Sequence, residues 1–413
     1  MVEDCISISN CRLCGNPFFE NKLKLKPTPL ANELFEDRKK AMSAETFPLN
    51  LVMCISCNHI QLESSVSSER LFKNYLYTSS TSKIFQRHFD QYAQYVKEIL
   101  TPGSKILEIG SNDGYLLSKL AELGFDVTGL EPSATLSQIT SHQGLRVIND
   151  YLGTSFVNQL LDSGEKYDCI IGNNVFAHIP NLAKAFSDVS IILKDQGLFI
   201  MEVAHAAKIV TDGIFDSIYH EHHSYHTLIA LRPFLESLKF GIVKASIVET
   251  HGGSLRLVLR KNSVSSSSEY DEIEKNERLL GLDNPNVFLK IQTTIDEVKR
   301  RFDSAIYSED NQAVIGYSAP AKAITLLSQV CDDPSIIQFI VDDNVLKQGK
   351  FIPKFGIPIV EASHLTLFRN NSSKKGVLCL IFAWNITSEI ENKLSQIMPL
   401  NSKFMSLLPV RGG

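Results

Sequence analysis

A short segment in the middle of the chain concentrates side chains that can move protons. Residues 219–226, YHEHHSYH, contain four histidines, two tyrosines and one glutamate. Imidazole titrates near physiological pH and is the usual general base of enzymes. The metalloprotease pattern H-E-x-x-H does not fit, because Glu221 precedes the pair His222 and His226 instead of following its first member. The segment therefore indicates acid–base catalysis rather than a metal site, with a solvated polar loop as the alternative.

A second set of reactive side chains lies near the N-terminus. Four of the eight cysteines form two C-x-x-C pairs, CRLC and CISC, with 39 residues between them, and Gly15 and Asn58 follow the pairs where tight turns need positive φ. Four thiolates from two such turns can close a tetrahedral zinc site without an open position, which is typical of structural zinc. Redox-active pairs are the alternative, but the strand–helix–strand context that they need is missing. We predict a structural Zn²⁺ ion bound by Cys11, Cys14, Cys54 and Cys57.

The framework for these side chains begins with a glycine-rich turn after an apolar strand. The stretch KILEIGSNDGYLLSKLAELGFDVTGLE predicts a strand at 105–109, a helix at 115–123 and a second strand that ends at Glu131. Gly110 lets the backbone approach a ligand, and Gly114 lets the helix pack close to the strand. Glu131 is placed to accept hydrogen bonds from ribose hydroxyls. The unit predicts an adenosine-containing cofactor, without the G-x-G-x-x-G pattern of nicotinamide enzymes.

Two further apolar strands end in polar residues. They are predicted at 169–171 and in GLFIMEVAH. Ligands of open α/β sheets bind at the carboxyl ends of strands, so the polar residues there are candidates for a site. Each of these residues alone is explained equally well as a polar loop residue or as a ligand-binding residue. Their shared placement at strand ends favours ligand binding. These residues are Asn173, Asn174, His178, Glu202 and His205.

The last third of the chain repeats the α/β pattern. A serine-rich and then acidic stretch at 261–277 predicts a flexible connection, and a long amphipathic helix follows at 286–304. The stretch QAVIGYSAPAKAITLL then predicts a strand, a turn and a helix. Backbone N–H groups at such a turn suit an anionic group, and Lys322 and Lys347 can neutralise a diphosphate there. A packing turn with surface lysines is the alternative.

Length and composition limit the remaining possibilities. A chain of 413 residues predicts two or three domains. The net charge of −5 and the lack of a basic run argue against nucleic-acid binding. The N-terminus has no apolar signal-peptide core, and no run of about 18 apolar residues predicts a membrane span. We expect a cytoplasmic protein that binds neither nucleic acid nor membrane.

Together these motifs resemble a known family. The chain is similar to the S-adenosylmethionine-dependent C-3′-methyltransferases that act on nucleotide-linked keto-deoxysugars. It shares with them the twin C-x-x-C pairs, YLYTSSTS, LEIGSNDG, NNVFAHIP, IYHEHHSYHTL, THGGSLR, GYSAPAKA and DDNVLKQGKFIP, over nearly its whole length. The resemblance implies an α/β fold in three parts: a zinc-binding domain at 1–75, a Rossmann-like methyltransferase domain at 76–262, and a C-terminal α/β Rossmann-like domain at 263–413.

The resemblance also implies roles for the proton-moving residues. Tyr219, Glu221 and His222 would carry the chemistry, with His222 as the base and His178 nearby. Methylation of carbon needs a carbanion-like nucleophile, so a hydrogen beside the ketone must leave while the enolate is stabilised. Glu221 or another carboxylate would orient His222, and Tyr219 or His178 would donate to the enolate oxygen.

The same resemblance, taken with the residue patterns, predicts two binding sites. The S-adenosylmethionine site would comprise Glu108, Gly110, Asn112, Asp113, Gly114, Glu131, Asn173 and Asn174. A TDP- or GDP-linked keto-deoxysugar would contact Tyr75, Tyr77, Ser79, Ser80, His205, Ser254, Arg256, Lys322 and Lys347. From the residues alone, Arg256 is as well explained as an exposed strand charge. We expect a monomer or a weak homo-oligomer.

Two other functions compete with this prediction. A nicotinamide-dependent nucleotide-sugar epimerase or dehydrogenase is disfavoured because the G-x-G-x-x-G pattern is absent. A non-catalytic, zinc-scaffolded binding module is disfavoured because Tyr219, Glu221 and His222 are all present. The chain departs from the family at His223 and His226, where phenylalanine is more frequent.

Overall fold

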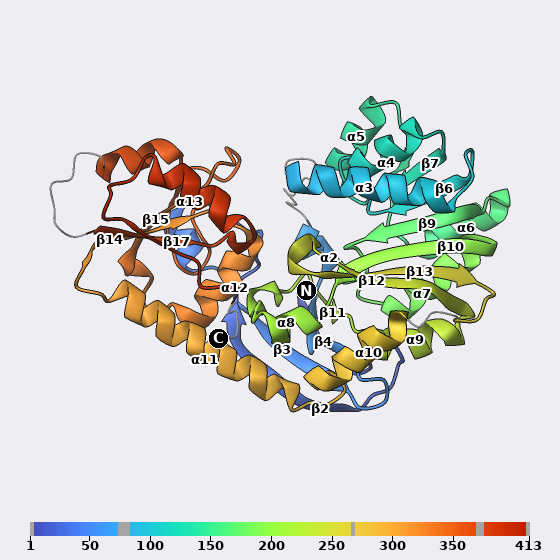
Figure 1. Cartoon of the computed structure of the whole chain (residues 1–413), viewed down its shortest axis with the longest axis horizontal. Helices are drawn as coiled ribbons and strands as arrows, with labels where there is room; N and C mark the ends of the chain where they lie inside the picture. The colour runs from blue at the N-terminus through green and yellow to red at the C-terminus, as the bar shows by residue number, and fades with distance from the viewer. Residues whose placement is uncertain (1–3, 73–82, 266–268, 369–375, 410–413) are drawn as a thin grey trace.

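The computed structural model describes residues 4–72, 83–265, 269–368 and 376–409, and its strands form four sheets. Figure 1 shows two lobes, one from the middle of the chain and one from its C-terminal third. The N-terminal strands lie low in this view, between the two lobes. Among the described helices, none is both long enough and apolar enough to cross a membrane.

A seven-stranded sheet forms the lobe from the middle of the chain. Its strands are β6 (Lys105–Ile109), β7 (Asp126–Leu130), β8 (Val147–Ile148), β9 (Tyr167–Asn173), β10 (Leu193–Ala204), β12 (Phe240–Val248) and β13 (Ser254–Lys261). They lie in the order β12-β13-β10-β9-β6-β7-β8. The strands from β10 to β8 in this order are parallel, and β12 and β13 are antiparallel. The chain reverses its direction of strand addition between β6 and β9, which is where ligands bind in such sheets.

Helices cover both faces of this sheet because neighbouring side chains along a strand point to opposite faces. Ile106 and Ile171 pack in the apolar cluster that includes α3 and α4, while Leu107 and Ile170 pack in the cluster that includes α6, α7 and α9. The helices of this lobe are α3 (Lys83–Ile99), α4 (Tyr115–Glu122), α5 (Ala134–His142), α6 (Thr154–Ser163), α7 (Leu182–Ile192) and α9 (Leu228–Ser237), while the short α8 (Ala207–Thr211) packs in the cluster of the N-terminal strands and α11 (Val287–Ile306).

The N-terminal strands form a four-stranded antiparallel sheet that takes one strand from the histidine-rich segment. Its members are β2 (Phe19–Thr28), β3 (Phe47–Cys54), β4 (Ile60–Leu62) and β11 (Ser224–Tyr225), in the order β11-β4-β3-β2. A separate pair is formed by β1 (Cys5–Ser7) and β5 (Ser64–Val66), and the short helices are α1 (Arg38–Met42) and α2 (Ser68–Phe72). The β4–β11 pairing places Ser224 and Tyr225, which directly follow His222 and His223, against the N-terminal part of the chain.

Five parallel strands form the C-terminal sheet, in the order β16-β15-β14-β17-β18. They are β14 (Asn311–Tyr317), β15 (Ile337–Val341), β16 (Ile359–Val360), β17 (Gly376–Ile381) and β18 (Lys403–Met405). The accompanying helices are α11 (Val287–Ile306), α12 (Ala321–Val330) and α13 (Thr387–Ser395), whereas α10 (Glu269–Leu280) packs against β12 and α9 of the seven-stranded sheet (Figure 1). Short 3₁₀ segments occur at η2 (Phe215–Ser217), η3 (Thr250–Gly252), η4 (Pro334–Ile336), η5 (Ala362–Phe368) and η6 (Trp384–Ile386).

The N-terminal sheet shares its apolar core with the C-terminal part of the chain. Leu49 and Leu51 of β3 belong to one buried cluster with Ile295 and Phe302 of α11 and Leu327 of α12. Burial of apolar side chains is the main favourable term in folding. The N-terminal strands are therefore held by packing against helices that lie more than 200 residues later in the sequence.

The predicted flexible connection at 261–277 is wrong in its second half, which is helical. Helix α10 begins at Glu269, and two of its acids are anchored by distant partners. Glu274 accepts two hydrogen bonds from the guanidinium of Arg232, at 2.7 and 2.9 Å. Glu277 is fully buried and accepts the first backbone N–H groups of α9. These anchors depend on residues far away in the sequence, so composition alone did not indicate them.

Candidate active site

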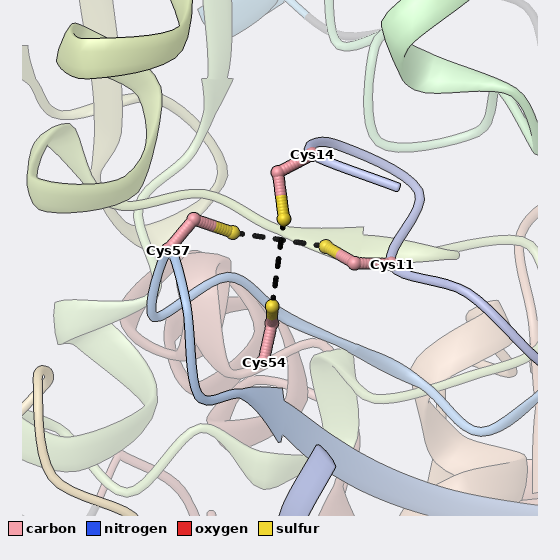
Figure 2. Close-up of side chains that lie close together, drawn as sticks. All are labelled: Cys11, Cys14, Cys54 and Cys57. Atoms are coloured by element: carbon pink, nitrogen blue, oxygen red, sulfur yellow. Dashed lines mark hydrogen bonds between the residues drawn. The ribbon is translucent and has the colours of Figure 1, made fainter. Parts of the chain in front are cut away.

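Four cysteine side chains converge at the end of β3 (Figure 2). The Sγ atoms of Cys11 and Cys57 lie 3.7 Å apart, those of Cys14 and Cys54 lie 3.6 Å apart, and all four lie within 4.8 Å of one another. A tetrahedral ion with Zn–S bonds of about 2.3 Å separates its sulfur ligands by about 3.8 Å. The cluster therefore fits the predicted structural zinc ion.

The turns after the two cysteine pairs have the backbone geometry that was predicted. Gly15 has a φ of +74° and Asn58 a φ of +60°. Among the described residues, the four cysteines are the only group of three or more His, Cys, Asp or Glu side chains arranged to hold a metal ion. The described side chains of residues 219–226 do not form such a group.

The cysteine cluster is connected directly to the histidine-rich segment. Between β3 and β4, the Nε2 atom of His59 lies 3.1 Å from the hydroxyl of Ser224. The backbone N–H of Leu62 donates to the carbonyl of His223, at 3.0 Å. Arg12, which lies between the first two cysteines, donates to the carbonyl of Leu62. These contacts tie β4 and β11 to the turns that carry the cysteines.

The glycine-rich turn after β6 packs closely against the loop that follows β9. A Cβ atom on Gly110 would lie 2.4 Å from Val175 Cγ2, so only glycine fits there. Asn112 takes a φ of +51°, and its backbone N–H donates to Glu131 at 2.9 Å. The other oxygen of Glu131 accepts the backbone N–H of Ser133 at 2.8 Å. A carboxylate has about four acceptor positions, so the side chain of Glu131 retains capacity for two ribose hydroxyls.

Carboxylates and unsatisfied polar atoms surround this turn. Burial raises the pKa of Glu108 well above its usual range, and the neighbouring charges of Asp113 and Glu131 add to the effect. Both polar atoms of the Asn173 side chain, and one oxygen of Glu108, are buried without a hydrogen-bond partner among the described residues. Unsatisfied buried polar atoms cost free energy, and such atoms beside acids indicate a ligand with positive charge and polar groups.

Two side chains of the histidine-rich segment form a hydrogen-bonded pair that reaches the surface. Between residues 213 and 231, only Tyr219 and His222 are not buried. The Tyr219 hydroxyl lies 2.8 Å from His222 Nε2, and His222 Nδ1 lies 2.9 Å from the carbonyl oxygen of Ser217. Because a carbonyl can only accept, we assign the ring proton to Nδ1. The Tyr219 hydroxyl therefore donates to the lone pair of Nε2 in this structure, and Nε2 is the ring nitrogen that can accept a proton.

His178 connects this pair to the glycine-rich turn. Its ring packs edge-on against His222, with centroids 4.9 Å apart. Three residues earlier in the same loop, Val175 closes against Gly110. Burial lowers the pKa of His178 to about 4, although a hydrogen bond to the backbone of Glu221 acts in the opposite direction, so its imidazole is neutral at physiological pH. The predicted base and the predicted cofactor turn therefore contact the same loop.

Glu221 does not contact His222, although a carboxylate was expected to orient that ring. Its side chain is buried and accepts a hydrogen bond of 2.6 Å from the amide of Asn32, and burial raises its pKa to about 7. The carbonyl of Ser217 orients the ring instead. Neither Asn32 nor Ser217 was a candidate from the sequence, because a single amide in an extended stretch and a backbone carbonyl carry no pattern.

Three predicted substrate contacts are engaged within the protein. His205 Nε2 lies 2.7 Å from a carboxylate oxygen of Glu277, and Arg256 Nη2 lies 2.8 Å from a carboxylate oxygen of the fully buried Glu202. Ser254 donates to a backbone carbonyl in its own turn. The side chain of Arg256 is 14% exposed, so the alternative of an exposed strand charge is wrong. The polar groups of these three residues are therefore used in contacts within the protein.

The contacts of Glu202 make a pH-dependent prediction. Burial alone would raise its pKa, but contacts with His88, Arg256 and Thr250 outweigh burial and lower it to about 2. A lowered pKa stabilises the fold above the unfolded value, and this stabilisation is lost as the pH falls through the folded value. Replacing Glu202 with Gln should therefore cost on the order of 3 kcal/mol at pH 7, and about 1 kcal/mol less at pH 3.5.

Urea unfolding of the Glu202→Gln variant at both pH values measures this difference. Glu122→Gln is the control, because that side chain lies on the surface at the end of α4 and is 62% exposed. A cost of Glu202→Gln that is equal at pH 7 and pH 3.5 would show that the carboxylate charge contributes nothing.

The two predicted diphosphate lysines lie near the carboxyl edge of the C-terminal sheet. Lys347 Nζ donates to the carbonyl of Ala319 at 2.9 Å and lies 3.5 Å from Asp342. Lys322 Nζ lies 4.6 Å from the ring centroid of Trp384, over its face. The remaining predicted substrate contacts, Tyr75, Tyr77, Ser79 and Ser80, lie outside the described residues.

Three family models match successive parts of the chain. A model described as "Putative zinc binding domain" matches residues 11–72. One described as "Methyltransferase domain" matches residues 83–245, and one described as "C-methyltransferase C-terminal domain" matches residues 249–409. Their order agrees with the sequence motifs, and their boundaries leave only short stretches unmatched.

Individual proteins resemble all or part of this chain. "C-methyltransferase NovU" from Streptomyces niveus is 26% identical over 416 residues, which cover 97% of this chain and 96% of NovU. A ubiquinone biosynthesis O-methyltransferase from a Chelativorans species is 30% identical over 120 residues, or 28% of this chain and 47% of that protein. Among solved structures, the magnesium protoporphyrin IX methyltransferase of Synechocystis with bound SAM matches with a TM-score of 0.34 and 19% identity. That match covers 47% of this chain and 88% of the other.

Proposed function

We propose that this S-adenosylmethionine-dependent C-methyltransferase methylates C-3′ of a nucleotide-linked 4-keto-6-deoxysugar. The observation that supports this most strongly is the pair of Tyr219 and His222, which is accessible and presents a basic nitrogen. A base of this kind is what a carbon acceptor needs, since a C–H bond beside a ketone must be broken before the carbon can attack a methyl group.

In the proposed reaction, His222 Nε2 removes the proton from C-3 of the sugar. The electron pair of the C–H bond forms the C-3 to C-4 double bond, and the carbonyl π electrons move to the oxygen at C-4. The Tyr219 hydroxyl or the N–H of the neutral His178 ring donates to that oxygen, which stabilises the enolate as it forms. The carbonyl of Ser217 stabilises the imidazolium through Nδ1–H.

The turn after β6 would hold the methyl donor. When bound, S-adenosylmethionine supplies an electrophilic methyl group on a sulfonium cation, and the nucleophilic sugar carbon accepts it. Glu131 would bind the ribose hydroxyls, and the acids Glu108 and Asp113 would favour the positive charge of the donor. Asn173 would contribute an amide whose two polar atoms have no partner among the described residues. Holding both reactants side by side supplies much of the rate.

The donor site gives a second prediction, on binding. Glu131→Gln removes the negative charge and one acceptor oxygen, so it should weaken S-adenosylhomocysteine binding about 10- to 100-fold. Isothermal titration calorimetry measures this change, with Glu122→Gln on the surface of α4 as the control. Unchanged affinity in Glu131→Gln would show that the ribose does not bind at the end of β7.

Residues of the C-terminal part would bind the nucleotide end of the acceptor. Lys322 and Lys347 are proposed to neutralise its diphosphate, and the tyrosines and serines of residues 75–80 are proposed to line the sugar pocket. We also propose a role for each of the three parts of the chain. Residues 1–75 would form a metal-stabilised structural domain, residues 76–262 would bind the methyl donor, and residues 263–413 would bind the acceptor. The zinc ion would be structural, because its four thiolate ligands leave no open position.

A panel of TDP- and GDP-linked 4-keto-6-deoxysugars tests the proposal. Incubation with the protein and isotopically labelled S-adenosylmethionine should give one product that carries the labelled methyl group on C-3′, by mass spectrometry and NMR. Absence of transfer to every keto-sugar would favour a non-catalytic binding module. Tight binding of NAD without binding of S-adenosylhomocysteine would favour the nicotinamide-dependent alternative.

A further inference from the structure

Asp216 lies one residue before the carbonyl that orients His222. It belongs to the single 3₁₀ turn η2, and its side chain is completely buried. One carboxylate oxygen of Asp216 accepts the indole N–H of Trp384 at 2.8 Å. The other oxygen is buried without a hydrogen-bond partner among the described residues. A buried carboxylate needs partners to offset its desolvation, and here the side-chain donor comes from the C-terminal part of the chain, beside backbone N–H groups of the turn itself.

A second contact attaches the other end of the same turn. The hydroxyl of Thr325 in α12 donates to the carbonyl of Ile218, at 3.0 Å. Trp384 also packs against the turn at Gly252, where a Cβ atom would lie 2.5 Å from the indole. Ser217, between Asp216 and Ile218, is therefore held from both sides by residues of the C-terminal part. Its carbonyl oxygen is the acceptor that keeps the proton on Nδ1 of His222.

Lys322 lies beside this arrangement. Its ammonium group stands 4.6 Å from the Trp384 ring centroid, and the Asp216 charge acts on it without an ion pair of 4.0 Å or less. Trp384 thus contacts both charged side chains, one through its N–H and one through its ring face. The indole of Trp384 thus makes two contacts: its ring face lies beside a cation, and its N–H donates to a carboxylate. Together these contacts limit the positions that the indole can take.

We propose that Asp216 is a positioning residue for methyl transfer. By accepting the indole N–H of Trp384, it fastens the turn that carries the Ser217 carbonyl to the C-terminal part of the chain. The orientation of His222 then depends on that part being in place. This inference rests on the proposed function of His222 as the base.

The test compares two substitutions of Asp216 that differ in hydrogen bonding. Asp216→Ala removes the hydrogen-bond acceptor of the indole N–H, and it should lower kcat at least 30-fold. The KM for the keto-sugar and the affinity for S-adenosylhomocysteine should stay within threefold of wild type. Asp216→Asn keeps an oxygen that can accept the indole N–H, so kcat should recover to within fivefold of wild type. Asp212→Asn is the control, because this nearby acid contacts Lys208 and Thr211 on the surface instead.

Trp384 is the single tryptophan of the chain, so its emission reports on this contact directly. The emission should shift in Asp216→Ala and not in Asp212→Asn. Trp384→Phe keeps an aromatic ring but lacks the donor, and its kcat should fall at least tenfold without a change in donor affinity. This variant tests the proposal even where Asp216→Ala does not fold.

Two results would overturn the positioning role. One is a kcat within threefold of wild type in a folded Asp216→Ala or Trp384→Phe protein. The other is an Asp216→Asn protein as impaired as Asp216→Ala. Failure of the wild-type protein to methylate any keto-sugar would instead contradict the proposed function, so the two failures are distinguishable.

Discussion

Replacing His222 with alanine should lower the rate of methyl transfer about 10²- to 10⁴-fold, the usual contribution of a positioned general base. The physical reason is that Nε2 is the accessible nitrogen with a lone pair, while Nδ1 is occupied by the Ser217 carbonyl. Affinity for S-adenosylhomocysteine should stay within threefold of wild type, because the turn after β6 is untouched. Single-turnover kinetics and calorimetry measure the two quantities separately.

Two further variants make this result specific. Tyr219→Phe should lower the rate less than His222→Ala does, since His178 can also donate to the enolate oxygen. His142→Ala removes an exposed histidine at the end of α5 and should have no effect. A wild-type rate in His222→Ala would place the base on another residue, and a loss of donor affinity in that variant would show a structural defect instead.

Replacing Cys54 and Cys57 together with serine should remove the bound zinc and disable methyl transfer. Structural zinc contributes about 10–16 kcal/mol in isolated zinc-finger peptides, and we expect a loss on the order of 5 kcal/mol in this larger chain. Methyl transfer should fall at least 30-fold, because β4 follows the second cysteine pair and pairs with β11, which begins two residues after His222. Mass spectrometry measures the zinc content, thermal unfolding measures the stability, and a turnover assay measures methyl transfer.

Donor binding distinguishes loss of the metal site from global unfolding. The donor turn belongs to the seven-stranded sheet, so the double cysteine variant should retain S-adenosylhomocysteine affinity within fivefold at 15 °C. Cys5→Ser is the control, because Cys5 lies outside the metal cluster. Full zinc occupancy in the double variant, or wild-type turnover in a zinc-free protein, would contradict the assignment.

Elements whose signals are local could be predicted from the sequence. The strand predicted at 105–109 agrees with β6 at both ends, because an apolar run and a glycine mark its limits. The cysteine cluster was likewise predictable, since two C-x-x-C turns constrain the backbone as well as the chemistry. The proximity of His178 to His222 was expected from the family resemblance, and their rings are in contact.

Roles that depend on distant partners could not be predicted. Arg256 looked like a substrate contact because nothing in the sequence indicated that Glu202 lies beside it. His205 looked available because its partner, Glu277, falls in a stretch whose composition is typical of a linker. A polar residue at a strand end is a candidate for function, and whether another side chain already satisfies it is a property of the tertiary structure alone.

Hydrogen exchange at C-3 of the acceptor tests the central claim most directly. The protein, a 4-keto-6-deoxysugar substrate and S-adenosylhomocysteine are combined in D₂O, so that the proton can leave and return while no methyl group is available. If His222 is the base, NMR should show deuterium at C-3 with wild-type protein, and His222→Ala should exchange at the rate of the buffer alone. Exchange by His222→Ala at the wild-type rate would contradict the account.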